Sequence, residues 1–303
     1  MLFRGTASPI NARSETEERG KRVMRNTKTV IASDEITSEG VTRRLPAGRY
    51  MVSVFGEVTS TNTLLKEQAA AGAPEGTVLI ASAQSAGRGR MGRSFFSPED
   101  TGLYMSLLLR PAGLSDVQLV TTAAAVAVSE AVEEETGILT GIKWVNDLYA
   151  DGKKVCGILT EGTFCGGTLN WCVLGIGINV YPPKAGFPSA LTEKAGALLT
   201  ERIPGLRERL AAAILLRFSA YYDLLSEKPH LGAYRSRCFL MNRSVDVLLP
   251  EGGRRAVVAG IDDDFGLSVR YDDGSCAVLR SGEVSLDIKQ TVPSEEERPV
   301  PGE

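Results

Sequence analysis

The texture of the sequence changes after Cys238, and this change constrains the fold more than any other feature of the chain. Beyond that point the apolar runs are short and alternate with turns rich in Gly and Asp, a pattern typical of antiparallel strands. We therefore expect a small antiparallel barrel at residues 237–288 and a disordered Pro/Glu tail at 289–303. The predicted strands of the barrel are residues 245–249, 256–261, 267–271 and 276–279.

Residues 50–236 mix strand-like and helix-like segments, which predicts a larger domain of a different kind. One helix is expected after Ser60, whose hydroxyl suits an N-cap. A second should run from a capping box at Ser115 to Gly137, and a long amphipathic one should follow Pro204. Strands are predicted at residues 51–55, 77–83 and 103–109, and short β-rich segments at residues 141–150, 155–161 and 168–179.

Residues 1–49 are polar and charged without sustained periodicity, so we expect a flexible N-terminal arm. The three apolar-faced helices of a winged-helix DNA-binding domain are not found there. The same segment has no apolar run suited to a signal peptide. The longest apolar stretch, residues 117–132, is interrupted by polar residues and predicts a core helix, not a membrane span.

The composition excludes several classes of function. The chain is 43% hydrophobic and 23% charged, and its net charge of -3 argues against general affinity for nucleic acids or membranes. The single histidine, His230, excludes most Ser-His-Asp, Cys-His and multi-histidine metal mechanisms; we interpret it as a surface or packing residue. The five cysteines form no C-x-x-C pair, which favours reduced, buried thiols and a cytoplasmic location.

Residues 87–93 read Gly-Arg-Gly-Arg-Met-Gly-Arg and carry the clearest chemical signal. The glycines satisfy G-x-G-x-x-G, but no helix follows the motif to receive a pyrophosphate, so a Rossmann site is not expected. A kinase glycine loop is disfavoured because no catalytic-loop sequence accompanies it. Arginines separated by glycines suit a backbone that closely approaches a phosphate or carboxylate, and we expect this loop to bind an anion.

Two further clusters follow along the chain. Residues 143–147 read Lys-Trp-Val-Asn-Asp, and a second motif runs from Lys154 through Gly157-Ile158-Leu159 to Glu161. Residues 175–179 read Gly-Ile-Gly-Ile-Asn. Taken singly, each could be a buried strand that ends in a turn.

In this order, and with Ser60-Thr61-Asn62 upstream, these motifs resemble those of the biotin–protein ligases over residues 50–288. Two departures occur: Val145 stands where proline is usual, and Met91 replaces a common basic residue. The resemblance implies an α+β, class II synthetase-like fold. Its features are a mixed central sheet with helices mainly on one face, and a small SH3-like C-terminal barrel. It also implies a biotin- and ATP-binding catalytic domain at residues 50–236.

The resemblance implies that biotin and ATP, with Mg²⁺, form biotinyl-5′-AMP, which passes biotin to a lysine of a biotin carboxyl carrier protein or domain. Because carboxylate and α-phosphate repel each other, cations must neutralise both. Lys143 is the candidate that contacts both groups. Arg90 and Arg93 should hold phosphates. Asp147 is either a magnesium ligand or a turn residue. ATP contacts are expected from Arg88, Arg90, Arg93, Lys143, Asn146 and Asn179.

The biotin contacts implied by the resemblance form a second group. Ser60 and Thr61 suit the ureido group, and Gln84 and Arg88 should lie near the biotin carboxylate or the ureido end. Three glycines, Gly157, Gly175 and Gly177, would line a flat apolar slot. The expected biotin-binding set is Ser60, Thr61, Asn62, Gln84, Gly87, Arg88, Gly157, Gly175 and Gly177.

Two other functions remain as alternatives. Lipoate–protein ligases share the fold and the acyl-adenylate strategy. Their signature contains a histidine, however, and the single histidine of this chain, His230, lies outside the motifs described above. A biotin-sensing regulator without catalysis is the second alternative, and the lack of a recognisable DNA-binding domain argues against a repressor. We expect no DNA or membrane partner; the sequence is compatible with either a monomer or a homodimer.

Overall fold

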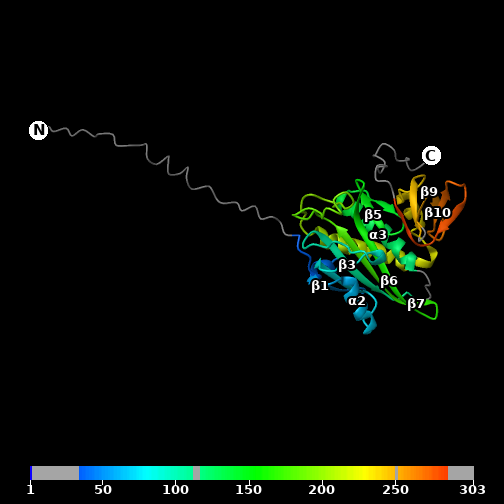
Figure 1. Ribbon diagram of the computed structural model, residues 1–303. Helices are drawn as coiled ribbons and strands as arrows, with labels where there is room; N and C mark the ends of the chain where they lie inside the picture. The colour runs from blue at the N-terminus through cyan, green and yellow to red at the C-terminus, as the bar shows by residue number, and fades with distance from the viewer. Residues whose placement is uncertain (2–33, 112–116, 250–251, 286–303) are drawn as a thin grey trace. The chain divides into compact units, whose positions relative to one another are not determined.

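A computed structural model describes residue 1 and residues 34–111, 117–249 and 252–285. Its centre is a seven-stranded sheet in the order β1-β2-β3-β7-β6-β5-β4 (Figure 1). The β1–β2 pair is parallel and all the other neighbours are antiparallel, so the sheet is mixed. Its strands are β1 (Met51–Val58), β2 (Thr77–Gln84), β3 (Gly102–Leu109), β4 (Gly141–Lys143), β5 (Asp147–Ala150), β6 (Lys153–Cys165) and β7 (Thr168–Asn179).

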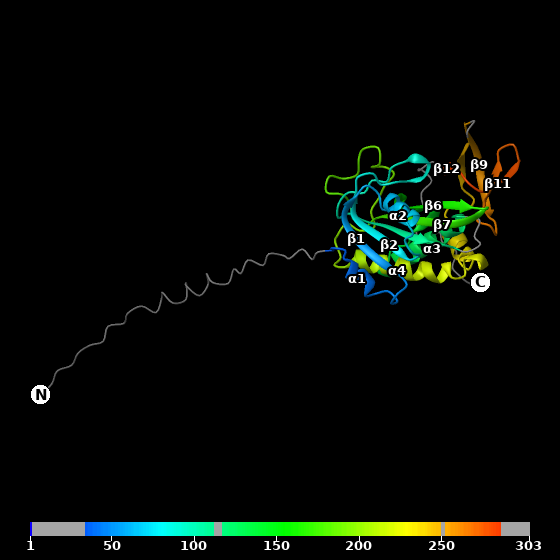
Figure 2. The ribbon, with the colours of Figure 1, turned by 90° about the horizontal axis from the view of Figure 1, so that it is seen from below.

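The helices divide unequally between the two faces of this sheet (Figure 2). On one face, α3 (Val117–Thr136) packs on β4 to β7, and α4 (Leu206–Tyr222) packs on α3 and β3. On the other, α2 (Thr61–Ala70) packs on β2, β3 and β7. Strand alternation explains the division: Leu107 joins the large core with α3 and α4, whereas its neighbour Leu108 joins the smaller core beneath α2. The mixed α+β architecture was therefore predicted correctly.

The helix boundaries follow the expected local chemistry. Ser60 is the N-cap of α2, and its hydroxyl accepts a hydrogen bond from the Thr63 amide at 3.4 Å. Gly137, with φ 73°, follows the end of α3 in a conformation that favours glycine. The predicted core helix at 117–132 is confirmed as the buried part of α3. The capping box at Ser115 lies outside the described residues.

A second, five-stranded antiparallel sheet follows the last helix, α5 (Leu231–Arg237). Its order is β11-β10-β9-β8-β12, and buried Val, Ala and Leu side chains alternate with exposed positions along β9 and β10. The four strands predicted after Cys238 are all present, and the structure adds a fifth. The strands are β8 (Ser244–Leu249), β9 (Gly252–Ile261), β10 (Leu267–Tyr271), β11 (Cys276–Leu279) and β12 (Glu283–Ser285).

The prediction that residues 1–49 form a flexible arm is wrong for residues 34–49. Helix α1 (Ser38–Thr42) lies in this segment and packs on α4 and β1. Asp34, 2% exposed, forms a buried ion pair with Arg207 at 3.1 Å, and Val41 is fully buried. These contacts are formed with residues far along the chain, so local periodicity carried no sign of them. Residues 2–33 and the predicted tail at 289–303 lie outside the described residues.

The structure confirms only part of the prediction of reduced, buried thiols. All five cysteines are free, but two of them, Cys165 and Cys276, are exposed instead of buried. In the described part of the chain, no helix is long and apolar enough to cross a membrane.

His230 is a packing residue, not a surface residue. It is fully buried, its ring stacks on Phe265 with centroids 4.7 Å apart, and Nε2 lies 3.0 Å from Thr122 Oγ1. Nδ1 has no hydrogen-bond partner among the described residues. Burial therefore disfavours the charged ring and lowers the pKa of His230 from 6.5 to about 4.

This lowered pKa predicts acid destabilisation. Below pH 6.5 the unfolded chain gains a proton that the folded chain rejects until about pH 4, so stability falls as the pH falls through this window. We expect about 2 kcal/mol of stability to be lost through His230 between pH 7 and pH 5. Urea unfolding at both pH values should show this loss in the native chain and not in His230→Gln. Equal pH dependence in the two proteins would contradict the assignment.

Candidate active site

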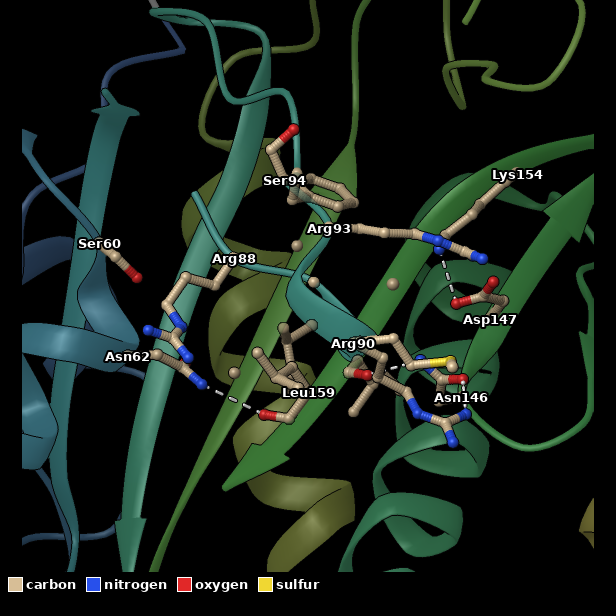
Figure 3. Close-up of a pocket in the computed structure, with 18 of the residues that line it drawn as sticks. Ser60, Asn62, Arg88, Arg90, Arg93, Ser94, Asn146, Asp147, Lys154 and Leu159 are labelled. Atoms are coloured by element: carbon tan, nitrogen blue, oxygen red, sulfur yellow. Dashed lines mark hydrogen bonds and ion pairs between the residues drawn. The ribbon is translucent and has the colours of Figure 1, made fainter. Parts of the chain in front are cut away.

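A pocket opens on the α2 face of the large sheet, where β3, β6 and β7 lie side by side. Most of the side chains that reach it come from the start of α2, the end of β2, the loop between β2 and β3, the β4–β5 hairpin and β6 (Figure 3). The lining comprises Ser60, Thr61, Asn62, Gln84, Arg88, Gly89, Arg90, Met91, Arg93, Ser94, Phe95, Met105, Lys143, Trp144, Asn146, Asp147, Lys154, Gly157, Ile158, Leu159, Gly175, Ile176 and Gly177.

Glycines line the floor of this pocket, and neighbouring side chains occupy the space that a Cβ would need. A Cβ on Gly175 would lie 2.1 Å from Asn62 Oδ1, and one on Gly177 would lie 2.7 Å from the ring of Phe95. Both distances are shorter than real Cβ contacts, so these strand positions require glycine for packing reasons. The glycines therefore let Asn62 and Phe95 pack close to the sheet at the floor of the pocket.

A network of neutral polar groups closes one end of the pocket. Thr61 donates its backbone N–H to Gln84 Oε1 at 2.9 Å, and Gln84 Nε2 donates to Ser97 Oγ at 2.9 Å. Ser106, fully buried on β3, lies 2.6 Å from Asn62 Oδ1 and 2.7 Å from Thr61 Oγ1. These bonds fix the amide and hydroxyl orientations, as a recognition site for a small polar group requires.

The arginine–glycine loop crosses the pocket, and its arginines spread along it instead of meeting at one point. In Figure 3, Arg88 lies beside Asn62, whereas Arg90 reaches toward Asn146 and Arg93 extends toward the far end. Arg90 donates to Asn146 Oδ1 at 2.9 Å and to the Gly282 carbonyl at 3.1 Å. The loop therefore places positive charge at both ends of the pocket.

The Lys-Trp-Val-Asn-Asp segment forms the turn between β4 and β5 at the other end of the pocket. The Trp144 indole donates to the Phe265 carbonyl at 2.8 Å, and Asn146 Nδ2 donates to the Ile158 carbonyl at 2.7 Å. Asp147 Oδ1 lies 2.7 Å from Lys154 Nζ in an ion pair (Figure 3). The Lys143 side chain also lines the pocket, with Nζ 6.0 Å from the Tyr149 ring centroid.

Charge in the pocket is strongly one-sided. Among the described lining residues the cations are Arg88, Arg90, Arg93, Lys143 and Lys154, and the one carboxylate is Asp147. Such an excess of cations beside a glycine floor suits a ligand, or a pair of ligands, with several negative charges. Among the described residues, no group of three His, Cys, Asp or Glu side chains could by itself hold a metal ion.

Two of the predicted site residues are not brought into the pocket. Gly87 is a packing glycine, because a Cβ there would lie 2.4 Å from the Phe95 carbonyl. The Asn179 side chain, 8% exposed, donates to the Gly196 carbonyl at 3.0 Å. The other predicted residues all line the pocket: Ser60, Thr61, Asn62, Gln84, Arg88, Arg90, Arg93, Lys143, Asn146, Asp147, Gly157, Gly175 and Gly177.

Sequence reasoning also missed residues that shape the site. Lys154 and Glu161 stood inside a quoted motif but received no role, although one lines the pocket and the other pairs with Arg88. Their charge and their place in the motif could have marked them. Phe95 and Ser106 carried no distinguishing signal, because an aromatic and a serine are ordinary beside or within a strand.

Comparison with known proteins places this pocket in a family whose members include biotin ligases. A model of the biotin/lipoate A/B protein ligase family matches residues 54–179. The bifunctional ligase/repressor BirA of Bacillus subtilis is 44% identical over 142 residues, which cover 46% of this chain and 44% of that protein. The biotin–[acetyl-CoA-carboxylase] ligase of Mycobacterium tuberculosis is 32% identical over 250 residues, covering 78% of this chain and 90% of that protein.

Among solved structures, the biotin protein ligase of Aquifex aeolicus in complex with biotin and ATP superposes with a TM-score of 0.66 at 31% identity. The superposition covers 77% of this chain and 97% of that one. The chain therefore belongs to the biotin protein ligases of the biotin/lipoate A/B protein ligase family. The chain spans less than half of the length of the Bacillus relative, 44% of that protein.

Proposed function

We propose that this protein is an ATP-dependent biotin–protein ligase. It forms biotinyl-5′-AMP and transfers the biotinyl group to a lysine of a biotin carboxyl carrier protein or domain. The observation that carries the proposal is one pocket that combines a floor of glycines, a group of hydroxyl and amide side chains at one end, and five cations distributed along its length. Family membership and the Aquifex relative, which binds biotin and ATP, support it.

The first half-reaction joins two anions. A carboxylate oxygen of biotin attacks the α-phosphorus of ATP, a P–O bond forms, the bond to the β-phosphate breaks, and pyrophosphate leaves. Lys143 and the arginines of the loop lower the repulsion between the two reactants and stabilise charge as it develops. We assign Arg90 and Arg93 to the phosphates, because both lie on the side of the pocket away from Ser60 (Figure 3). We assign Lys143, which lines the pocket from the end of β4, to the carboxylate and the α-phosphate.

The end of the pocket that is lined by hydroxyl and amide groups suits the bicyclic ring of biotin. Ser60, Thr61 and Gln84 offer hydroxyl and amide groups to the ureido group, and the floor at Gly175 and Gly177 accepts the flat ring. Asn62 completes this end. Arg88 lies beside it (Figure 3), and we assign it, together with Lys143, to the biotin carboxylate. Gly157 lines the pocket from β6. Gly87 acts only through the loop backbone in this proposal.

The adenine is assigned to the end that contains Asn146. The Asn146 amide already bonds to Arg90 and to the Ile158 carbonyl, so a base contact would have to share or exchange these bonds. Asn179 would have to give up the Gly196 carbonyl to reach a nucleotide. In this structure its amide instead holds the segment after Gly196 against the sheet.

Magnesium fits this pocket only as a companion of ATP. It is commonly held by one or two carboxylates together with substrate phosphates and water. Asp147 is the carboxylate that the described lining supplies, and its Oδ1 forms an ion pair with Lys154 Nζ at 2.7 Å. We therefore propose Asp147 as a magnesium ligand, with the charge of the ion helping to neutralise the triphosphate.

In the second half-reaction the lysine nitrogen of the acceptor attacks the carbonyl carbon of the adenylate. An amide bond forms, the bond from that carbon to the phosphate oxygen breaks, AMP leaves, and the nitrogen loses a proton. We propose that closure of the arginine–glycine loop excludes water during this interval and so limits hydrolysis of the mixed anhydride.

Incubation of the purified chain with labelled biotin, ATP and a biotin carboxyl carrier domain tests the proposed function. Label on the acceptor lysine, dependent on ATP, is the expected result. Biotin binding without turnover would instead identify a biotin-sensing regulator. Incorporation of lipoate or octanoate in preference to biotin would identify the other branch of the family.

Loop closure predicts protection from trypsin, which cleaves after arginine. In the free protein we expect cleavage at Arg88, Arg90 or Arg93, because the loop is partly exposed around Met91, itself 73% exposed. Biotin together with ATP should slow this cleavage about tenfold or more, because a closed segment must first open to be cut. Mass spectrometry of timed digests measures the rate at each bond. Unchanged sensitivity would refute closure.

We also propose that the five-stranded sheet is an SH3-like barrel, as in the family resemblance, and that the protein acts in the cytoplasm. Its free cysteines suit a reducing compartment. We propose no DNA or membrane partner. Sedimentation of the purified chain with and without biotin and ATP would decide between a monomer and a homodimer.

A further inference from the structure

One charged residue beside the pocket has no part in the proposed chemistry. Glu161 lies on β6 and is absent from the lining, yet its carboxylate accepts hydrogen bonds from three side chains. Oε1 lies 2.8 Å from Lys66 Nζ and 3.0 Å from Arg88 Nη2, and Oε2 lies 3.1 Å from Asn62 Nδ2. Two of the three donors, Arg88 and Asn62, line the pocket directly.

The bond to Asn62 determines which way its amide points. Nδ2 donates to Glu161 and also lies 3.3 Å from the Leu159 carbonyl, so Oδ1 must face the opposite side. There it lies 2.6 Å from Ser106 Oγ, in the space that a Cβ on Gly175 would need. Glu161 therefore orients a group that packs against the glycine floor.

The bond to Arg88 determines where a mobile cation rests. The Arg88 side chain is 47% exposed and comes from a loop, so without a partner its guanidinium would sample solvent. A guanidinium has donors on more than one edge, so the edge turned away from Glu161 can receive a second carboxylate. Burial raises the pKa of Glu161, but hydrogen bonds from Lys66 and Asn62 and the nearby positive charges outweigh it, and the pKa lies below its usual value. The carboxylate is thus charged at neutral pH.

We propose that Glu161 is a positioning residue that seats Arg88 and Asn62 so that the pocket selects a ligand bearing a carboxylate over its neutral amide. The inference rests on the proposed function, because the ligand in question is biotin. Glu161 itself touches no ligand; it acts through Arg88. We call the cluster of Glu161 with Lys66, Arg88 and Asn62 the seat. Lys66 offsets the negative charge of Glu161, so that the seat does not repel the incoming anion.

The contribution of the seat to folding is small. Ion pairs with partly exposed partners contribute little to stability, and the Glu161 side chain is 20% exposed. A Gln side chain keeps the size and the acceptor for Asn62 while it removes the charge that holds Arg88. Glu161→Gln should therefore fold normally and show its defect in ligand selection.

The test is a double-mutant cycle read out by calorimetric binding of biotin and of biotinamide, its neutral primary amide. The variants of the full chain are Glu161→Gln, Arg88→Ala and the double variant. Glu135→Gln is the matched control, because Glu135 is 19% exposed and pairs with Arg209 at 2.8 Å at the end of α3, outside the pocket. The control should bind both ligands as the native chain does.

We expect Glu161→Gln to weaken biotin about tenfold, the scale of one charge-assisted hydrogen bond, and to leave biotinamide within about twofold. In the Arg88→Ala background the same change should alter biotin binding by less than about twofold, because the seat has nothing left to hold. Equal loss for both ligands, or full additivity with Arg88→Ala, would overturn the inference. A native chain that binds neither ligand would instead remove the proposed function itself.

Discussion

Replacing Lys143 with alanine is expected to lower the rate of biotinyl-adenylate formation by about 10²–10³-fold, the usual loss for one preorganised electrostatic group. The side chain lines the pocket at the end of β4, where a rigid strand and the buried Trp144 hold its backbone. Because the ammonium acts on charge that develops as the anions meet, the defect should appear in kcat for pyrophosphate release. Single-turnover pyrophosphate release measures it directly.

Two lysines complete this experiment. Lys184→Ala, at an exposed position in the loop after β7, is the matched control and should leave the rate unchanged. Lys154→Ala should also slow adenylation, because it removes a second pocket cation and leaves Asp147 without its ion-pair partner. A near-normal rate for Lys143→Ala beside a slow Lys154→Ala would transfer the proposed role to Lys154.

Gly175→Ala is expected to weaken biotin binding by about 10²-fold, from overpacking and from blocking of the floor. Its Cβ would lie 2.1 Å from Asn62 Oδ1. Asn62 cannot yield easily, because Ser106, Glu161 and the Leu159 carbonyl hold both ends of its amide. Equilibrium binding of biotin, with thermal unfolding to confirm a folded chain, is the measurement.

Gly56→Ala provides the control for this substitution. Gly56 lies on β1 of the same sheet, and a Cβ there meets nothing within 4 Å. The control should bind biotin normally, because only the strand position changes. If Gly175→Ala binds biotin as tightly as Gly56→Ala does, the floor of this pocket is not the biotin site.

Local patterns predicted the elements of this fold well. Short apolar runs located the long strands, and the N-cap Ser60 and the stop at Gly137 located helix ends, because these signals depend only on residues close in sequence. The segment around Asp34 escaped prediction for the opposite reason. Its order comes from a buried ion pair with Arg207 and a packed Val41, and no periodicity reports contacts of that range.

The site residues, too, were predictable only where a local sequence signal marked them. The arginines of the loop and Lys143 could be selected from sequence, because fixed charges near glycines have few uses other than anion binding. Gly87 and Asn179 could not be separated from their motif neighbours. Both are close in sequence to residues that line the pocket. Gly87, however, packs against the Phe95 carbonyl, and the Asn179 side chain donates to the Gly196 carbonyl.

The sequence by itself determined the type of chemistry: a chain with one histidine, no C-x-x-C pair and clustered Arg, Lys and Gly can stabilise anions but has few groups for nucleophilic or metal-based catalysis. Only the tertiary structure decided which residues cooperate. The pairings of Arg88 with Glu161 and Asp147 with Lys154 bring together strands and loops, and their energies depend on distances that the order of residues does not contain.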